Sequence, residues 1–226
     1  MSYFANDFST TDESEQAGMN EFIWMTKIKA LDMSLTAMTD WRDKAFQPHF
    51  KSRSSESTSY NFCAFNVDQL AVITQSSNAQ MADWCLSTDM PQIPPGLALS
   101  QDFAELTFTH RQDRLVDENH ASILYSVGFS VPAEWADEFD DWYETEHLPM
   151  IYPCQHWAMT KRYRIIQSDQ GSTTTHLALH YLTDASGLDA PELKAARLTP
   201  WRNKLVKQPW FTQSEKWIYF RQRTTT

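Results

Sequence analysis

The segment 139–149, F-D-D-W-Y-E-T-E-H-L-P, holds the residues whose types and spacing best suit chemistry. Tyr143 and His147 are four residues apart, so on a helix they are neighbours on one flank. Glu146 continues the apolar stripe of the same helix, formed by Trp135, Phe139 and Trp142. The helix dipole and this carboxylate would favour the protonated imidazole at a helix C-terminus. A His tuned in this way donates or accepts a proton near neutral pH.

Structural roles would explain the same three residues without any chemistry. Tyr143 could pack in the core with a satisfied hydroxyl, and Glu146 could be a solvated charge. His147 could cap the last carbonyls of the helix. Spacing alone leaves both interpretations open, so the surrounding elements have to be considered.

The elements that must position these residues occur twice in the order β-α-β-β-α-β. Alternation predicts the strands, while cap residues and prolines bound the helices. The first half is expected to hold strands at 21–30, 59–67, 70–75 and 103–110, helices at 34–45 and 78–86, and a loop at 90–99. The second half is expected to hold strands at 122–130, 157–166, 176–182 and 213–221, and helices at 133–147 and 190–205. Pro48 and Pro149 should end the first helices, and Pro200 should interrupt or bend the last one.

An internal repeat supports this division. Asp40-Trp41 and Pro48 recur 101 residues later as Asp141-Trp142 and Pro149. The sequence therefore predicts an α+β protein in which two tandem ferredoxin-like repeats, 21–116 and 117–226, close sheet against sheet into an intrachain dimeric α/β barrel. Residues 1–20 are acidic and aperiodic, which predicts a disordered tail.

The second half resembles the EthD-like and methylmuconolactone-isomerase-like members of the dimeric α/β barrel superfamily. The resemblance covers about residues 120–223 and rests on W-Y-E-T-E-H-L-P (142–149), L-A-L-H-Y-L (177–182) and P-E-L-K-A-A-R-L-T-P-W-R (191–202). It implies that His147 lines a ligand pocket. It also implies cofactor-independent isomerisation, cyclisation, dehydration or decarboxylation, with Tyr143 as donor to an oxyanion and Glu146 or His180 as orienting partner.

The first half lacks these ionisable groups. At the offset of 101 residues, His147 corresponds to Phe46, and Tyr143 and Glu146 correspond to Arg42 and Ala45. We therefore expect a structural first half and a second half that carries the site.

Other side chains complete the candidate site. His176 and His180 point to one side of a strand, so His180 reaches the pocket if that side faces the helices. Substrate-binding candidates with large rings are Tyr125, Trp142, Trp201 and Tyr219. Each ring could equally belong to the core. The His pair lacks a third ligand nearby, so no metal is predicted.

Composition narrows the class of protein. A net charge of −10 argues against nucleic acid or an anionic membrane as a partner. The five glycines are scattered, which disfavours nucleotide-binding loops. Three distant cysteines, no signal peptide and no long apolar run indicate a cytoplasmic protein. We expect a monomer or homodimer without cofactor that acts on a small apolar organic molecule.

The sequence is compatible with two other functions. One is a haem-binding oxidoreductase, with His180 or His110 as the axial ligand. The other is a non-catalytic protein that binds small molecules.

Overall fold

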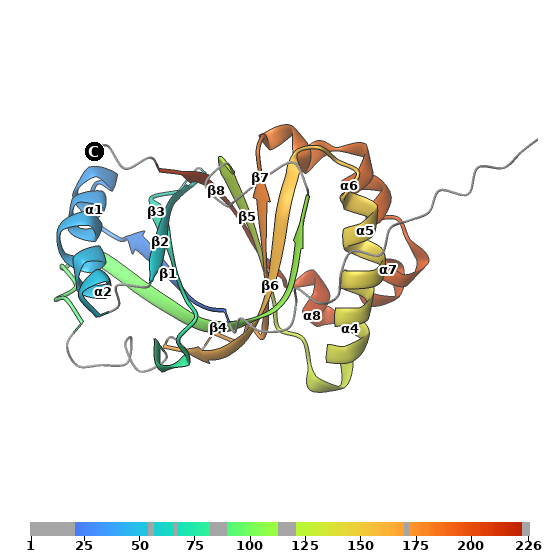
Figure 1. Ribbon diagram of the computed structural model, residues 1–226, viewed down its shortest axis with the longest axis horizontal. Coiled ribbons are helices and arrows are strands. Elements are labelled where there is room, and N and C mark those ends of the chain that lie inside the picture. Colours follow the sequence, from blue (N-terminus) through green and yellow to red (C-terminus); the bar gives the residue numbers. More distant parts are fainter. Residues whose placement is uncertain are drawn as a thin grey trace, which may run out of the picture.

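Figure 1 shows the computed structural model, in which a barrel of strands lies between two groups of helices. The structure describes residues 21–53, 57–65, 67–81, 90–112, 121–169 and 172–222. The expected tail at 1–20 and the expected boundary between residues 116 and 117 lie outside the described residues. Most of the expected helix at 78–86 also lies outside them, and only a 3-10 turn, Ala79–Met81, is described there.

The described strands close into one antiparallel barrel. They are β1 (Phe22–Ala30), β2 (Thr58–Ala64), β3 (Gln69–Ser76), β4 (Leu97–Arg111), β5 (Ile123–Phe129), β6 (Trp157–Ser168), β7 (His176–Leu182) and β8 (Glu215–Arg221). Their order around the barrel is β1-β3-β2-β8-β5-β7-β6-β4. The order β4-β1-β3-β2 in the first half is repeated as β8-β5-β7-β6 in the second, as two ferredoxin-like units require. The expected fold class is confirmed.

Two seams join the halves. The seam between β2 and β8 is short and runs from Phe62↔Arg221 to Ala64↔Tyr219. The seam between β4 and β6 is long and runs from Asp102↔Ser168 to Arg111↔Met159. Closure buries the inward faces of both sheets, where Met25, Leu179 and other side chains form one apolar cluster. It removes two apolar faces from water at once.

The first helix of each half is built in the same unusual way. In the first half, α1 (Leu35–Trp41) continues through a π-helical segment, Arg42–Phe46, into α2 (Gln47–Arg53). In the second half, a 3-10 turn (Ala133–Trp135) leads into α4 (Ala136–Trp142), a π-helical segment, Tyr143–His147, and α5 (Leu148–Ile151). Both π-helical segments stand at the same place in the repeat, which independently supports a duplicated scaffold.

The expectation that Pro48 and Pro149 end these helices was wrong. Each proline is the second residue of an α-helical segment that follows a π-helical one. There the backbone N–H of Gln47 bonds to Arg42 O, and that of Leu148 bonds to Tyr143 O, five residues back. This wider turn restarts the helix, and proline is tolerated in a first turn because its missing N–H leaves no bond unmade.

Further α-helices cover the second half, and the described residues of the first half hold none beyond α2. A 3-10 helix (Ala185–Asp189) is followed by α6 (Pro191–Ala196), α7 (Pro200–Leu205) and α8 (Pro209–Thr212). The expected helix at 190–205 is therefore two helices, and the break at Pro200 is confirmed. Thr199 begins α7, since its hydroxyl accepts the Arg202 N–H. Two apolar clusters, around Phe139 and around Leu193, fill the space between these helices and the sheet.

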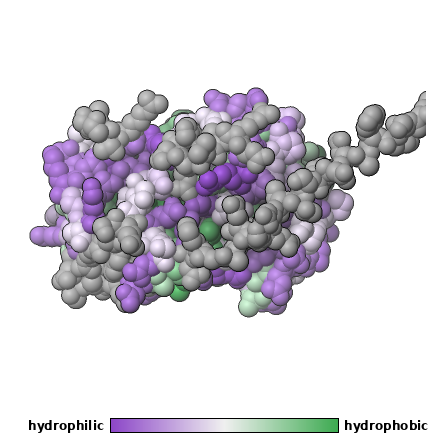
Figure 2. All heavy atoms as spheres, viewed as in Figure 1, coloured by the Kyte–Doolittle hydropathy of each residue, from purple (hydrophilic) through white to green (hydrophobic). Residues whose placement is uncertain are grey.

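The described surface that faces the viewer in Figure 2 is largely polar. Figure 2 shows hydrophilic residues over much of the visible described surface, with small apolar patches between them. Across the described part of the chain, none of the helices has the length and apolar character needed to span a membrane.

Candidate functional site

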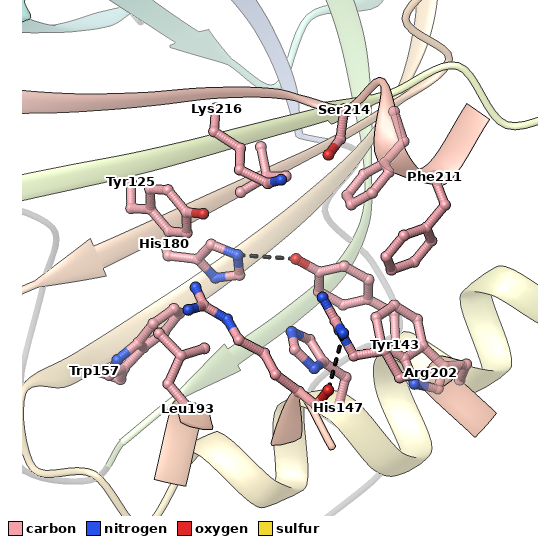
Figure 3. Close-up of a pocket in the computed structure, with 14 residues that line it drawn as sticks. Tyr125, Tyr143, His147, Trp157, His180, Leu193, Arg202, Phe211, Ser214 and Lys216 are labelled. Atoms are coloured by element: carbon pink, nitrogen blue, oxygen red, sulfur yellow. Dashed lines mark hydrogen bonds between the residues drawn. The ribbon is translucent and has the colours of Figure 1, made fainter. Parts of the chain in front are cut away.

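A pocket lies in the second half between the sheet and its helices, outside the barrel interior (Figure 3). It holds about 470 Å³ of space, including its open mouth. Strands contribute Tyr125, Val127, Phe129, Trp157, His180 and Lys216, while helices and their ends contribute Trp142, Tyr143, His147, Leu193, Arg197, Arg202, Phe211 and Ser214. Residues as far apart in sequence as Tyr125 and Lys216 thus meet at one place, because β7 and β8 both pair with β5 in the barrel.

A short hydrogen-bond chain crosses the floor of this pocket. His180 Nδ1 lies 2.9 Å from Thr160 Oγ1, and its Nε2 lies 2.9 Å from the Tyr143 hydroxyl (Figure 3). This confirms that the side of β7 that carries His180 faces the helices. Burial, with His147 and Arg162 nearby, holds the pKa of His180 well below its usual value. His180 is therefore a neutral imidazole that connects two hydroxyl groups.

Tyr143 is buried and held from two sides. Its hydroxyl bonds to His180, and the Arg162 guanidinium lies 4.5 Å from the centre of its ring. Arg162 is itself buried and pairs with Asp140 and Glu144 on the first helix. Burial raises the pKa of Tyr143, while Arg162 opposes the rise. The phenol therefore stays protonated at neutral pH and can act as a hydrogen-bond donor.

His147 lies beside Tyr143 in the pocket wall. Its ring stacks on Trp142 with centroids 4.6 Å apart and meets the edge of Tyr143 at 5.1 Å. Its Nδ1 is buried and has no hydrogen-bond partner among the described residues. Burial lowers the pKa of His147 to about 3, and the positive charges of Arg202, Arg197 and Arg162 add to that effect.

The expected protonated state of His147 was therefore wrong. The helix does not end at His147, because the π-helical segment passes into α5, which runs to Ile151. The favourable charge of a helix C-terminus is thus displaced by a full turn. The charges that act on the ring are those of arginines, at the end of α6 and in α7, and not that of a carboxylate.

Glu146 does not join the site. It is absent from the pocket wall, and its buried Oε1 has no hydrogen-bond partner among the described residues. The π-helical segment adds a residue to the turn and shifts the phase of the helix. The inward stripe therefore passes from Phe139 and Trp142 to Tyr143 and Leu148, all of them buried, and leaves Glu146 to one side.

Of the four ring-bearing candidates for substrate binding, two line the pocket and two do not. Tyr125 and Trp142 line the pocket as expected. Trp201 does not, since its Nε1 turns away and donates to Glu138 Oε1 at 3.2 Å. Tyr219 faces the barrel interior and accepts a hydrogen bond from Gln69 Nε2 at 2.9 Å. Its position in β8 has the opposite parity from Lys216, which does reach the pocket.

Sequence reasoning missed three cations. Arg197, Arg202 and Lys216 line the pocket, and none of its lining residues is an Asp or Glu. The two arginines stand five residues apart on either side of a helix break, and Lys216 comes from a distant strand. The string R-L-T-P-W-R (197–202) places two arginines close together, but periodicity does not show whether their side chains point toward the pocket.

A bound metal ion or haem needs ligand side chains that converge on one point with their donor atoms unoccupied. No group of three His, Cys, Asp or Glu side chains within the described ranges is placed to share a metal ion. The residues expected as haem ligands do not fit that role. Both ring nitrogens of His180 are already hydrogen-bonded, and His110 stacks on Tyr152 with centroids 3.2 Å apart.

Comparison with known proteins identifies the fold. No family model and no curated protein matches the sequence. Among solved structures, the chain is similar to an anthrone oxidase-like protein (8% identity, TM-score 0.66), with 92% of this chain and 93% of that chain covered. It is also similar to a mutant chlorite dismutase from Candidatus Nitrospira defluvii (8% identity, TM-score 0.60), with 95% and 96% covered. A third similar structure is that of a monooxygenase-like protein from Listeria innocua (9% identity, TM-score 0.53), with 92% of this chain and 96% of that chain covered.

These similarities extend over nearly the whole of each chain, so both halves of the barrel take part in them. At such low identities they concern the fold and confirm the dimeric α/β barrel. The finer resemblance to EthD-like proteins and the catalytic roles of individual residues stay predictions.

Proposed function

We propose that the protein is an enzyme that moves a proton on a small cyclic molecule bound in the second-half pocket, without a bound cofactor. The reaction is an isomerisation, cyclisation, dehydration or decarboxylation. One observation carries the proposal: an imidazole, His147, whose buried Nδ1 has no hydrogen-bond partner among the described residues, stands beside a hydrogen-bonded phenol, Tyr143, in an aromatic pocket.

The proposed roles follow from the protonation states. His147 is unprotonated at neutral pH, so its free nitrogen is available to accept a proton from an acidic C–H or O–H group. Tyr143 donates its proton in a hydrogen bond to the oxygen on which negative charge develops.

If Tyr143 donates its proton to the ligand, the direction of the two hydrogen bonds made by His180 is fixed. Thr160 donates to Nδ1 of His180, and Nε2–H of His180 donates to the phenol oxygen. His180 and Thr160 are then positioning residues. They aim the Tyr143 proton at the ligand and do not touch the ligand's reacting atoms.

Hydrogen–deuterium exchange tests the proposal before the natural substrate is known. The probe is 2-tetralone, a fused-ring ketone with acidic CH₂ protons, incubated with purified protein in D₂O. The proposal predicts that the protein speeds the loss of the CH₂ signal in NMR. His147→Phe should slow this catalysis at least about 10²-fold, with an unchanged circular dichroism spectrum. A folded variant with unchanged catalysis would reject the role of His147.

A second candidate function is oxidation of the same deprotonated ring by dioxygen. It is favoured because similar structures are described as anthrone oxidase-like and monooxygenase-like. In that reaction a ring CH₂ and O₂ give a ring C=O and water, and His147 would again remove the first proton. An oxygen electrode separates the two: uptake of one O₂ per product favours oxidation, and none favours isomerase or lyase chemistry. Ligand binding without exchange or oxygen uptake would indicate a non-catalytic binding protein.

A further inference from the structure

The charge of the pocket is opposite to that of the chain. The protein carries a net charge of −10, yet the pocket wall holds Arg197, Arg202 and Lys216 and no acidic residue. Within the described residues, no ion pair involves any of these three cations. Other cations of the second half are paired, such as Lys204 with Glu138 and Arg162 with Asp140. The three therefore form an uncompensated positive group, which we call the cation group.

The fold holds the cation group together at a cost. Arg197 is at the C-terminal end of α6, and Arg202 Nη1 donates to the Arg197 carbonyl at 2.9 Å (Figure 3). Lys216 enters from β8, across the pocket from His147 (Figure 3). Burial lowers the pKa of Arg202 and of Lys216, and repulsion from neighbouring arginines lowers both further. Such crowding of like charges is relieved when an anion binds among them.

The rest of the pocket suits a ring. Trp142, Trp157, Leu193 and Phe211 form apolar walls, and the guanidinium of Arg202 lies 5.6 Å from the centre of the Phe211 ring. Two buried polar atoms of the wall, Trp142 Nε1 and His147 Nδ1, have no hydrogen-bond partner among the described residues. A ligand of matching shape would have the apolar surface to contact, and the two unsatisfied polar atoms lie just beneath that surface.

We propose that the pocket takes a cyclic carboxylate, whose anionic group binds Arg197, Arg202 and Lys216 while its ring lies against Trp142 and Phe211. This names the substrate class of the enzyme and so rests on the proposed function, although binding itself requires no turnover. It departs from the expectation of a small apolar substrate, because the ligand would carry an anionic group beside its ring.

An anion in this position would also serve the proposed chemistry. The pKa of His147 is held low in part by Arg202 and Arg197. A carboxylate that offsets their charge raises the pKa of His147 toward the neutral range, where a general base works best. The correct ligand would thereby strengthen the base that acts on it.

Calorimetry with two matched probes tests the inference. The probes are 2-naphthoate and its neutral analogue 2-naphthamide, which share a ring and differ in charge. We expect 2-naphthoate to bind at least about tenfold more tightly, since its carboxylate can make charge-assisted hydrogen bonds that the neutral amide cannot. Arg202→Gln and Lys216→Gln should each remove most of this difference and leave 2-naphthamide binding unchanged.

Lys204→Gln is the matched control, since it removes one positive charge from α7 outside the pocket wall. It should leave the affinity for both probes unchanged. If Arg202→Gln does not fold, Lys216→Gln on the exposed rim decides alone. Equal affinity for the two probes, no binding of 2-naphthoate, or an equal loss in Lys204→Gln would overturn the inference. Charge-dependent binding together with unimpaired exchange in His147→Phe would instead refute the proposed function and leave the binding site standing.

Discussion

The first helices of the two halves share a backbone design and differ in chemistry. Both contain a π-helical segment at the same place, Arg42–Phe46 in one half and Tyr143–His147 in the other. In the first half the segment ends on Phe46, which is buried in an apolar cluster. In the second half it ends on His147, which lines a pocket. The duplicated backbone thus supplies the position, while the side chain there and the helices packed over it decide whether a pocket forms.

The sheets beneath these helices repeat the contrast. Trp24 pairs with Thr74, which pairs with Ser59, and the corresponding row of the second half is Tyr125, His180 and Thr160. A hydrogen bond spans the equivalent two positions in each row, Ser59 Oγ to Thr74 Oγ1 at 3.1 Å and Thr160 Oγ1 to His180 Nδ1 at 2.9 Å. Replacing a threonine by a histidine lengthens this side chain enough to reach Tyr143 on the helix.

The largest expected effect concerns a buried arginine, Arg162, at a strand position that holds no charge in the first half. Arg162 occupies the strand position that Asn61 holds in the first half. Arg162→Ala would leave Asp140 and Glu144 without their shared partner, at a cost of about 3 kcal/mol in the free energy of unfolding. Urea denaturation measures this quantity.

Asn61→Ala is the matched change in the first half. Asn61 Oδ1 accepts one neutral hydrogen bond from Gln47 Nε2, so its loss should cost only about 1 kcal/mol. Equal losses in the two variants would mean that the halves do not differ in buried charge as we describe.

Tyr143→Phe removes one hydroxyl group from the pocket. Catalysed exchange of 2-tetralone should fall about 10²-fold, because a donor to the developing oxyanion is lost. Tyr219→Phe removes a buried hydroxyl from the barrel interior, where it bonds to Gln69, and should leave exchange unchanged. Similar exchange rates in the two variants would mean that the hydroxyl inside the barrel affects exchange as much as the hydroxyl in the pocket.

The acid dependence of stability should depend on His147. Its surroundings are Arg197 and Arg202 from the helices, Arg162 from β6, and Tyr143 and His180. Its pKa is lowered to about 3 in the folded protein, below the usual value of about 6.5 in an unfolded chain. Between these values the unfolded chain binds more protons, so stability is complete above pH 6.5 and falls as the pH drops toward 3.

We expect His147→Phe to lessen this fall by up to about 1 kcal/mol per pH unit. Denaturation at several pH values measures it, and Phe46→Leu is the control in the first half. Parallel stability curves for the wild-type protein and His147→Phe would argue against a neutral His147.

The smallest effect is expected for an exposed ion pair between α1 and the π-helical segment that follows it. Lys44 and Asp40 form an ion pair at 2.7 Å, with both side chains mostly in water. Lys44→Ala should change the free energy of unfolding by less than about 0.5 kcal/mol. A larger loss in thermal denaturation would show that the first helix depends on surface charge in a way the second does not.

Sequence reasoning predicted the repeat, the barrel and the meeting of His147, Tyr143 and His180, because strand parity and helix spacing are local properties. It misplaced Glu146, since a π-helical segment changes the helix phase without a distinct composition. It misplaced Tyr219, because alternation does not say which face of a strand is the barrel interior. It missed Arg197 and Lys216, which meet only after β8 pairs with β5.

The central claim is that two copies of one scaffold carry a single proton-transfer site. The rate of 2-tetralone exchange in D₂O, measured for the wild-type protein, His147→Phe and Phe46→Leu, tests it most directly. Phe46→Leu is a tolerated exchange of apolar side chains at the matching position. We predict a loss of at least about 10²-fold in His147→Phe and no change in Phe46→Leu. An equal loss in both variants, or none in His147→Phe, would contradict the account.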